Sequence, residues 1–243
     1  MQDISHKRPF RSTYWLATSL VAIMVSMPCW AEIMRPYKAT YSTEWQVGLR
    51  LSGKAERSLK QDEQGHWQLR TEGSAMLANL TEISHFKLQQ QQLVPLKYSY
   101  HRQIFNKTRH VKLIFDWQKS QVMNQLNDQN WRMKIVPGTY DKQIVQLQLR
   151  RDLLAQRPNL SYIVADGGKL KVFSYQIEAE ETIATPLGKL RSIRVKRDRG
   201  GDNTRNTWIW FAPEHNFIVV RIEQQEANGK RYQLKLQQLT WLD

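Results

Sequence analysis

Apolar and polar residues alternate along most of the chain, and this period of two constrains the fold more than any other feature. Val111, Leu113, Phe115 and Trp117 occupy every second position of one such run. The segments 39–47 and 231–237 repeat the pattern. A strand with this alternation places one face on a core and the other in water. The pattern therefore predicts an antiparallel β protein in which most strands have one solvent-exposed face.

Turn residues separate the alternating runs. The sequences Asp62-Glu63-Gln64-Gly65, Asp166-Gly167-Gly168 and Asn228-Gly229 each lie between two strand-like segments. Asn-Gly is the pair preferred by a type I′ turn, so we expect a tight hairpin at Asn228-Gly229. About eleven or twelve strands follow from this spacing, many of them long. Such a set favours a strongly curved antiparallel sheet or an incomplete β-barrel.

One segment departs from the strand pattern. Residues 141–156 contain neither Gly nor Pro and are rich in Gln, Leu and Arg, which are good helix formers. Asp141 is placed to cap a helix, and Arg157-Pro158 is placed to end it. The apolar residues of this helix need burial, so we expect one helix that covers the concave face of the sheet. The predicted fold class is mostly β with one covering helix.

The first 31 residues have the layout of a secretory signal peptide. Three basic residues precede the apolar run from Leu16 to Met27, and Cys29 and Ala31 supply small residues before a cut at Glu32. The run is short for a membrane span, which needs about 20 residues, although an uncleaved anchor is the alternative. We therefore expect export to the periplasm of a Gram-negative bacterium, with no transmembrane span after processing. Residues 32–243 then form a single β-rich domain.

Charge and cysteine content limit the partners of the exported domain. The formal net charge is +14, of which the predicted signal contributes three basic residues and one acidic residue. Nucleic acid is the usual partner of a basic protein, but export argues against it. Anionic lipid head groups, lipopolysaccharide phosphates and acidic proteins remain, as does a basic surface with no dedicated partner. Cleavage before Glu32 removes Cys29, the single cysteine, so no disulfide is expected.

Several segments resemble a known family of exported bacterial proteins. They are the turn Thr185-Pro186-Leu187-Gly188, the runs 207–211 and 219–223, and Pro95-Leu96-Lys97-Tyr98. Together they are similar to domain-of-unknown-function family 3108 over residues 37–240, with Val219 where the pattern has proline. The resemblance implies export and a β-rich fold, and it implies no activity. A weaker similarity in fold links the chain to periplasmic lipoprotein carriers, in which a curved sheet wraps a hydrophobic cavity.

The sequence contains no catalytic motif and no motif for a metal or cofactor. The histidines lack the spacing of a zinc site, although His85 and His101 could meet on adjacent strands. There is no nucleophile elbow around a serine, and Gly200-Gly201 is not followed by the residues of a phosphate-binding loop. We expect a protein that is not an enzyme. The charged loop near Gly200-Gly201 predicts contact with an anionic surface through Lys196, Arg197, Arg199 and Arg205.

Tryptophan is unusually frequent, with nine residues in the chain, and it tells more about function than the motifs above. Trp208 and Trp210 share one face of a predicted strand, while Ile209 and Phe211 share the other. A strand that is apolar on both faces lies centrally in a core, or it separates a core from a ligand cavity. On the second interpretation, a ligand would contact Trp208, Trp210, Ile209, Phe211, Trp45 and Trp117.

Three functions are compatible with these features. The first is a periplasmic binding or carrier protein for an apolar or amphiphilic envelope ligand. The second is an envelope assembly or scaffold factor that docks a protein partner through its basic surface. The third, a hydrolase of envelope polymers, would need converging carboxylates or a Ser/His set, and the residue spacing gives no sign of either. We favour the first.

Overall fold

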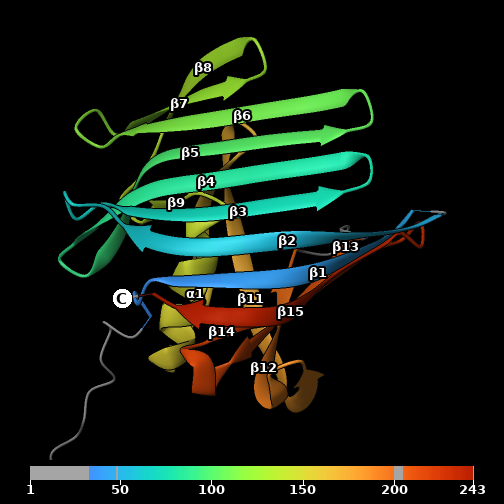
Figure 1. Ribbon diagram of the computed structural model, residues 1–243. Helices are drawn as coiled ribbons and strands as arrows, with labels where there is room; N and C mark the ends of the chain where they lie inside the picture. The colour runs from blue at the N-terminus through green and yellow to red at the C-terminus, as the bar shows by residue number, and fades with distance from the viewer. Residues whose placement is uncertain (1–32, 48, 200–204, 243) are drawn as a thin grey trace, which may run out of the picture.

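A computed structural model describes residues 33–47, 49–199 and 205–242. The predicted signal segment 1–31 lies outside the described residues, as does the centre of the charged loop between Arg197 and Arg205. The described chain forms one fifteen-stranded sheet that is not closed into a barrel, together with one α-helix (Figure 1). The predicted class, a mostly β curved sheet with one helix, is confirmed. The strand number is higher than expected because the pattern missed short strands such as Thr139–Tyr140.

The first half of the chain is an antiparallel meander in which every strand pairs with its neighbours in sequence. Alternating burial, as in Trp67 and Leu69 of the third strand, follows the period of two in the sequence. The strands are β1 (Tyr37–Val47), β2 (Leu49–Gln61), β3 (Trp67–Ala75), β4 (Ala78–Gln89), β5 (Gln92–Ile104), β6 (Lys107–Asp116), β7 (Gln121–Leu126) and β8 (Gln129–Lys134).

The second half begins with the short edge strand β9 (Thr139–Tyr140) and the helix α1 (Ile144–Leu154), and continues as a second meander. Strand β10 pairs with β9 in parallel, and all later pairs are antiparallel. A 3-10 turn, η1 (Pro213–His215), separates β13 from β14. The strands are β10 (Ser161–Asp166), β11 (Lys169–Thr185), β12 (Gly188–Asp198), β13 (Arg205–Ala212), β14 (Ile218–Glu226) and β15 (Arg231–Trp241).

The two meanders meet at one seam in the middle of the sheet, where β1 pairs with β15. Tyr37 lies opposite Trp241 and Gln46 lies opposite Arg231, with one register shift between Thr40 and Tyr41. Every other neighbouring pair in the sheet joins strands that are consecutive in sequence. The first and last strands therefore hold the two halves together.

Helix α1 lies against the face of the sheet that we call the inner face (Figure 1). Arg57 of β2 donates to the side-chain oxygen of Gln146 at 2.8 Å, and the side chains of Ile144, Leu147 and Leu149 are at most 1% exposed. Oδ1 of Asp141 accepts hydrogen bonds from the backbone N–H groups of residues 143 and 144, both at 2.9 Å. The predicted helix is confirmed, and Asp141 holds its first turn as expected.

The sheet curls far enough for its two ends to share a core. Ala165 of β10 belongs to an apolar cluster with Tyr98, Leu113 and Val122 from β5, β6 and β7. A larger cluster surrounds α1 and contains inward-facing residues of both meanders. The ammonium group of Lys142 lies 5.8 Å from the centre of the Tyr98 ring, beside this junction. Apolar side chains and α1 therefore occupy the inner face of this open, barrel-like sheet.

The structure corrects one local prediction. Gly229 has a φ of 80°, but Asn228 does not have a positive φ, and the N–H of Gly229 bonds the carbonyl of Glu226 at 3.0 Å. This geometry is a type I turn followed by a left-handed glycine, not a type I′ turn. Positive φ at both central residues occurs instead at Gly167 (63°) and Gly168 (78°), and at Gln90 (49°) and Gln91 (61°). The longer loop before Lys230 explains the difference, because it gives Asn228 room to keep an ordinary backbone conformation.

Candidate functional site

Strand β13 has a different environment on each face. Ile209 and Phe211 point to the inner face and are 4% and 0% exposed, within the core around α1. Trp208 and Trp210 point to the opposite, outer face, where cross-strand neighbours on the same face are charged. Trp208 lies opposite Glu223 of β14, and Trp210 lies opposite Arg221. The predicted two-sided strand exists, but its tryptophan side lies against ionic groups.

These tryptophans line a groove of about 560 Å³ on the outer face, which we call the tryptophan groove. Its walls come from both halves of the chain, because the β1–β15 seam brings β1 and β2 beside β14 and β15. Residues of β11, β12 and β13 complete it. The side chains that line the groove include Glu44, Arg50, Glu178, Arg194, Trp208, Trp210, Glu223, Gln225, Arg231 and Gln233.

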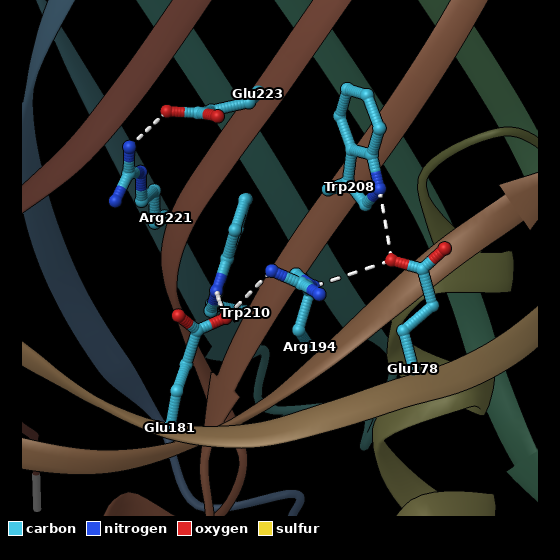
Figure 2. Close-up of polar contacts among 7 residues, drawn as sticks. All are labelled: Glu178, Glu181, Arg194, Trp208, Trp210, Arg221 and Glu223. Atoms are coloured by element: carbon cyan, nitrogen blue, oxygen red, sulfur yellow. Dashed lines mark hydrogen bonds and ion pairs between the residues drawn. The ribbon is translucent and has the colours of Figure 1, made fainter.

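Arg194 organises the floor of the groove. Its guanidinium group lies 3.3 Å from a carboxylate oxygen of Glu178 and 3.2 Å from one of Glu181 (Figure 2). The same Glu178 oxygen accepts the indole N–H of Trp208 at 3.0 Å, and the same Glu181 oxygen accepts that of Trp210 at 2.7 Å. One arginine, two carboxylates and two indoles thus form a continuous polar chain. Each member fixes the orientation of the next.

A β-bulge in β11 brings the two carboxylates to the same face of the sheet. The register between β11 and β12 shifts between Ile177 and Ala179, which leaves Glu178 as the extra residue of β11. An extra residue re-aims its side chain and increases local twist. Glu178 and Glu181 are three positions apart, so in a regular strand they would point to opposite faces. The bulge lets both carboxylates reach Arg194 on the outer face.

Cations cover the faces of the two indoles. The guanidinium carbon of Arg221 lies 4.9 Å from the centre of the Trp210 ring, and the ammonium group of Lys196 lies 5.8 Å from that of Trp208. Arg221 also pairs with Glu223, as Figure 2 shows. Trp210 is 4% exposed, whereas Trp208 is half-buried at the groove wall. Trp208 is therefore the indole that a bound molecule can reach.

The acidic side chains of the groove are already paired with basic ones. Glu178, Glu181 and Glu223 each pair with an arginine, and Glu178 and Glu181 also accept an indole N–H. The side chains offer hydrogen bonds and one aromatic edge to a polar or zwitterionic group. Among the described residues, no cluster of three or more His, Cys, Asp or Glu side chains could hold a metal ion.

The other residues that we predicted to contact a ligand lie outside the tryptophan groove. Trp45 is on the inner face of β1, opposite Tyr232 of β15. Trp117 stacks on Phe115 with 5.7 Å between ring centres, donates its N–H to the carbonyl of Pro95 at 2.7 Å, and lines a different groove. Ile209 and Phe211 lie in the core, so the six residues do not form one site. Only Trp208 and Trp210 share a site.

The four basic residues that we predicted to contact an anionic surface lie on both faces of the sheet. Lys196 points outward to Trp208, whereas Arg197 lies 3.3 Å from the centre of the Phe173 ring on the inner face. Arg199 donates to the hydroxyl of Thr207 at 3.3 Å, and Arg205 pairs with Glu226 at 2.5 Å. Burial, together with the positive charges of Arg197 and Arg205, lowers the pKa of Arg199 to about 10. In the described part of this loop, some of the basic side chains therefore lie on the inner face.

The histidine pairing differs from the sequence-based interpretation. His85 of β4 lies opposite Lys97, whereas His101 of β5 lies opposite His110 of β6, with 3.0 Å between their Nδ1 atoms. Sequence reasoning also missed Glu178, Glu181, Arg194, Arg221 and Glu223. The opposite charges of residues 178–181 and 191–197 were the signal that could have indicated them, because the two segments flank the turn at Pro186-Leu187.

The fold and this groove define a class of single-sheet, barrel-like proteins with an internal helix. The sequence matches the model of the protein family of unknown function DUF3108 over residues 37–237, and the chain belongs to that family. No protein of curated function matches the sequence. No described helix has the length and apolar character needed to cross a membrane.

A solved structure supports the fold. A β-barrel-like protein of the DUF1849 family from Brucella abortus has a TM-score of 0.60 at 8% identity, over 86% of this chain and 99% of that one. The hypothetical protein CT021 from Chlamydia trachomatis (14% identity, TM-score 0.29, 87% and 91% coverage) is a more distant match. So is a DUF1329 family protein from Desulfovibrio piger (8% identity, TM-score 0.28, 87% and 88% coverage). The first likeness shows a barrel-like fold.

Proposed function

We propose that this protein is a non-enzymatic binding or carrier protein of the bacterial periplasm that holds an amphiphilic envelope molecule by its polar head in the tryptophan groove. The observation that carries the proposal is the bridge made by Arg194 between Glu178 and Glu181, each of which also accepts an indole N–H. Because these side chains are already oriented, they lose little conformational entropy when a ligand binds. The predicted signal segment supports the compartment.

The composition of the groove favours an amphiphilic ligand over a purely apolar one. Carboxylates, guanidinium groups and amides line its walls, so an apolar chain would remove them from water without offering hydrogen bonds. The buried side chains of Leu147 and Leu149 meanwhile occupy the inner face, where a lipoprotein-carrier cavity would lie. A sugar, phosphate-ester or zwitterionic head that hydrogen-bonds along the groove and rests on Trp208 satisfies both observations.

The alternative is an assembly factor that docks a protein through its basic surface. It would use Lys196, Arg197, Arg199 and Arg205, which divide between the two faces of the sheet. A flat protein partner cannot contact both faces at once. This geometry makes the alternative the weaker of the two proposals.

Native mass spectrometry of protein purified from the periplasm without detergent tests the proposal. We expect a co-purifying adduct that survives gentle ionisation and is lost in Trp208→Ala, with affinity reduced about tenfold or more. Trp131→Ala is the matched control, because Trp131 is also a half-buried indole but lies on β8 at the far end of the sheet. Wild-type protein without any adduct, or an adduct equally lost in Trp131→Ala, would overturn the proposal.

A further inference from the structure

Two neighbouring hairpin turns expose large apolar side chains at one end of the sheet. Met76 and Leu77 form the β3–β4 turn and are 87% and 52% exposed, and Phe105 of the β5–β6 turn is 60% exposed. The N–H of Phe105 donates to the carbonyl of Leu77 at 2.8 Å, which ties the two turns side by side. Figure 1 shows both turns at the same edge. We call Met76, Leu77 and Phe105 the tip patch.

The backbone of Phe105 makes its exposure hard to explain by folding alone. Phe105 is the first residue of a two-residue turn and has a φ of 53°, a region that favours glycine and strains a bulky side chain. Because Phe105 is also 60% exposed, packing offsets little of this strain. Such a residue persists where it has a use outside the folded chain.

Positive charge lies beside the tip patch, on the β5–β6 hairpin. Arg102 of β5 lies directly opposite Arg109 of β6, a like-charge pair that costs stability, and Lys107 follows the turn itself. All three side chains are exposed, and none of them forms an ion pair with a residue that the structure describes. The acidic residues of the β3–β4 hairpin, Glu72 and Glu82, lie four and five residues from Met76 and Leu77, and they already bind Arg70 and the Tyr98 hydroxyl. Apolar turn residues flanked by basic residues complement a surface that has an apolar interior and anionic groups on its outside.

We propose that the tip patch docks this protein on an anionic lipid bilayer. Met76, Leu77 and Phe105 enter the boundary between head groups and acyl chains, while Arg102, Lys107 and Arg109 contact lipid phosphates. Exposed apolar patches rimmed by polar residues commonly mark membrane or partner interfaces, and the charge here selects the membrane. This docking surface is separate from the tryptophan groove and does not depend on its function.

Co-sedimentation with vesicles tests the docking. The wild-type protein should bind vesicles of phosphatidylethanolamine and phosphatidylglycerol, bind phosphatidylcholine vesicles much more weakly, and dissociate as salt rises. The triple variant Met76→Ser, Leu77→Ser, Phe105→Gly should bind at least about tenfold more weakly. Val172→Ser with Ile177→Ser is the matched control, because these β11 side chains are 67% and 55% exposed but lie outside the patch.

The single variant Phe105→Gly separates docking from folding. Glycine relieves the positive φ, so the thermal midpoint should stay unchanged or rise while vesicle binding falls. Equal binding to both kinds of vesicle, no binding by the wild type, or the same loss in the Val172/Ile177 control would overturn the proposal. Concentration-dependent dimerisation that the triple variant abolishes, without lipid binding, would also overturn it and assign the patch to a second copy of the chain.

Discussion

The carboxylate of Asp141 accepts a hydrogen bond from the hydroxyl of Ser84 at 2.8 Å, and this contact joins the start of α1 to strand β4. Both residues are fully buried. Oδ1 also accepts the two N–H groups of the first helical turn, whereas Oδ2 is buried without a hydrogen-bond partner. Burial dominates over these hydrogen bonds and raises the pKa of Asp141 to about 7.

This raised pKa makes stability depend on pH. Between about pH 4 and pH 7 the folded protein keeps a proton on Asp141 that the unfolded chain loses, so the unfolding free energy should fall as pH rises through this window. The contribution is roughly 4 kcal/mol at most. Urea unfolding from pH 4.5 to 7.5 measures it, and Asp141→Asn should flatten the slope. An identical slope in both proteins would contradict the assignment.

Arg194 should contribute modestly to stability through its two carboxylates. Its side chain and those of Glu178 and Glu181 are about a third exposed, so solvent screens both ion pairs. We expect Arg194→Met to lower the unfolding free energy by about 1 kcal/mol. The loss should shrink in the double variant with Glu181→Gln, since that change removes one uncompensated carboxylate. Purely additive effects in urea unfolding would exclude the coupling.

Gly168 should tolerate no side chain. It has a φ of 78°, and a Cβ atom there would lie 2.4 Å from the ring of Trp131. Gly167→Ala is the matched control, because Gly167 also has a positive φ (63°) but has only the end of the Lys171 side chain within 4 Å. Gly168→Ala should cost about 2 kcal/mol more than Gly167→Ala. Equal losses in thermal unfolding would contradict the close approach of β8 to the β10–β11 turn.

The helix should carry a large share of the core energy. Leu147 and Leu149 are 1% and 0% exposed, and each should cost about 2–5 kcal/mol when replaced by alanine. Leu187→Ala, at a turn where the side chain is 36% exposed, should change stability by less than about 1 kcal/mol. Equilibrium urea unfolding measures all three. Small losses at both helix positions would mean that α1 does not fill the inner face.

Much of the fold could be predicted from the sequence, because alternation reports each strand locally. Residues 111–117 alternate in the sequence, and Leu113 and Phe115 are buried in β6. The helix was also predictable, since Gln, Leu and Arg without Gly or Pro favour it. The pairing of β1 with β15 was not, because it joins segments from the two ends of the chain and leaves no local pattern.

The candidate site could be predicted only on its aromatic side. Trp208 and Trp210 share a face because of simple alternation, and the structure places both in one groove. Their partner Glu178 was missed because it reaches the groove through a bulge, which the alternation pattern does not mark. Phe105 was missed for a different reason. A lone aromatic residue in a turn looks like any other loop residue until its backbone angle and exposure are known.

The seam between β1 and β15 also has a consequence for how the molecule folds. Every other antiparallel contact in the sheet closes a short loop, so each meander can assemble on its own from local hairpins. Joining β1 to β15 closes nearly the whole chain and carries the largest loss of chain entropy. We therefore expect the seam to form last during folding, and hydrogen exchange to find it among the first pairings to open.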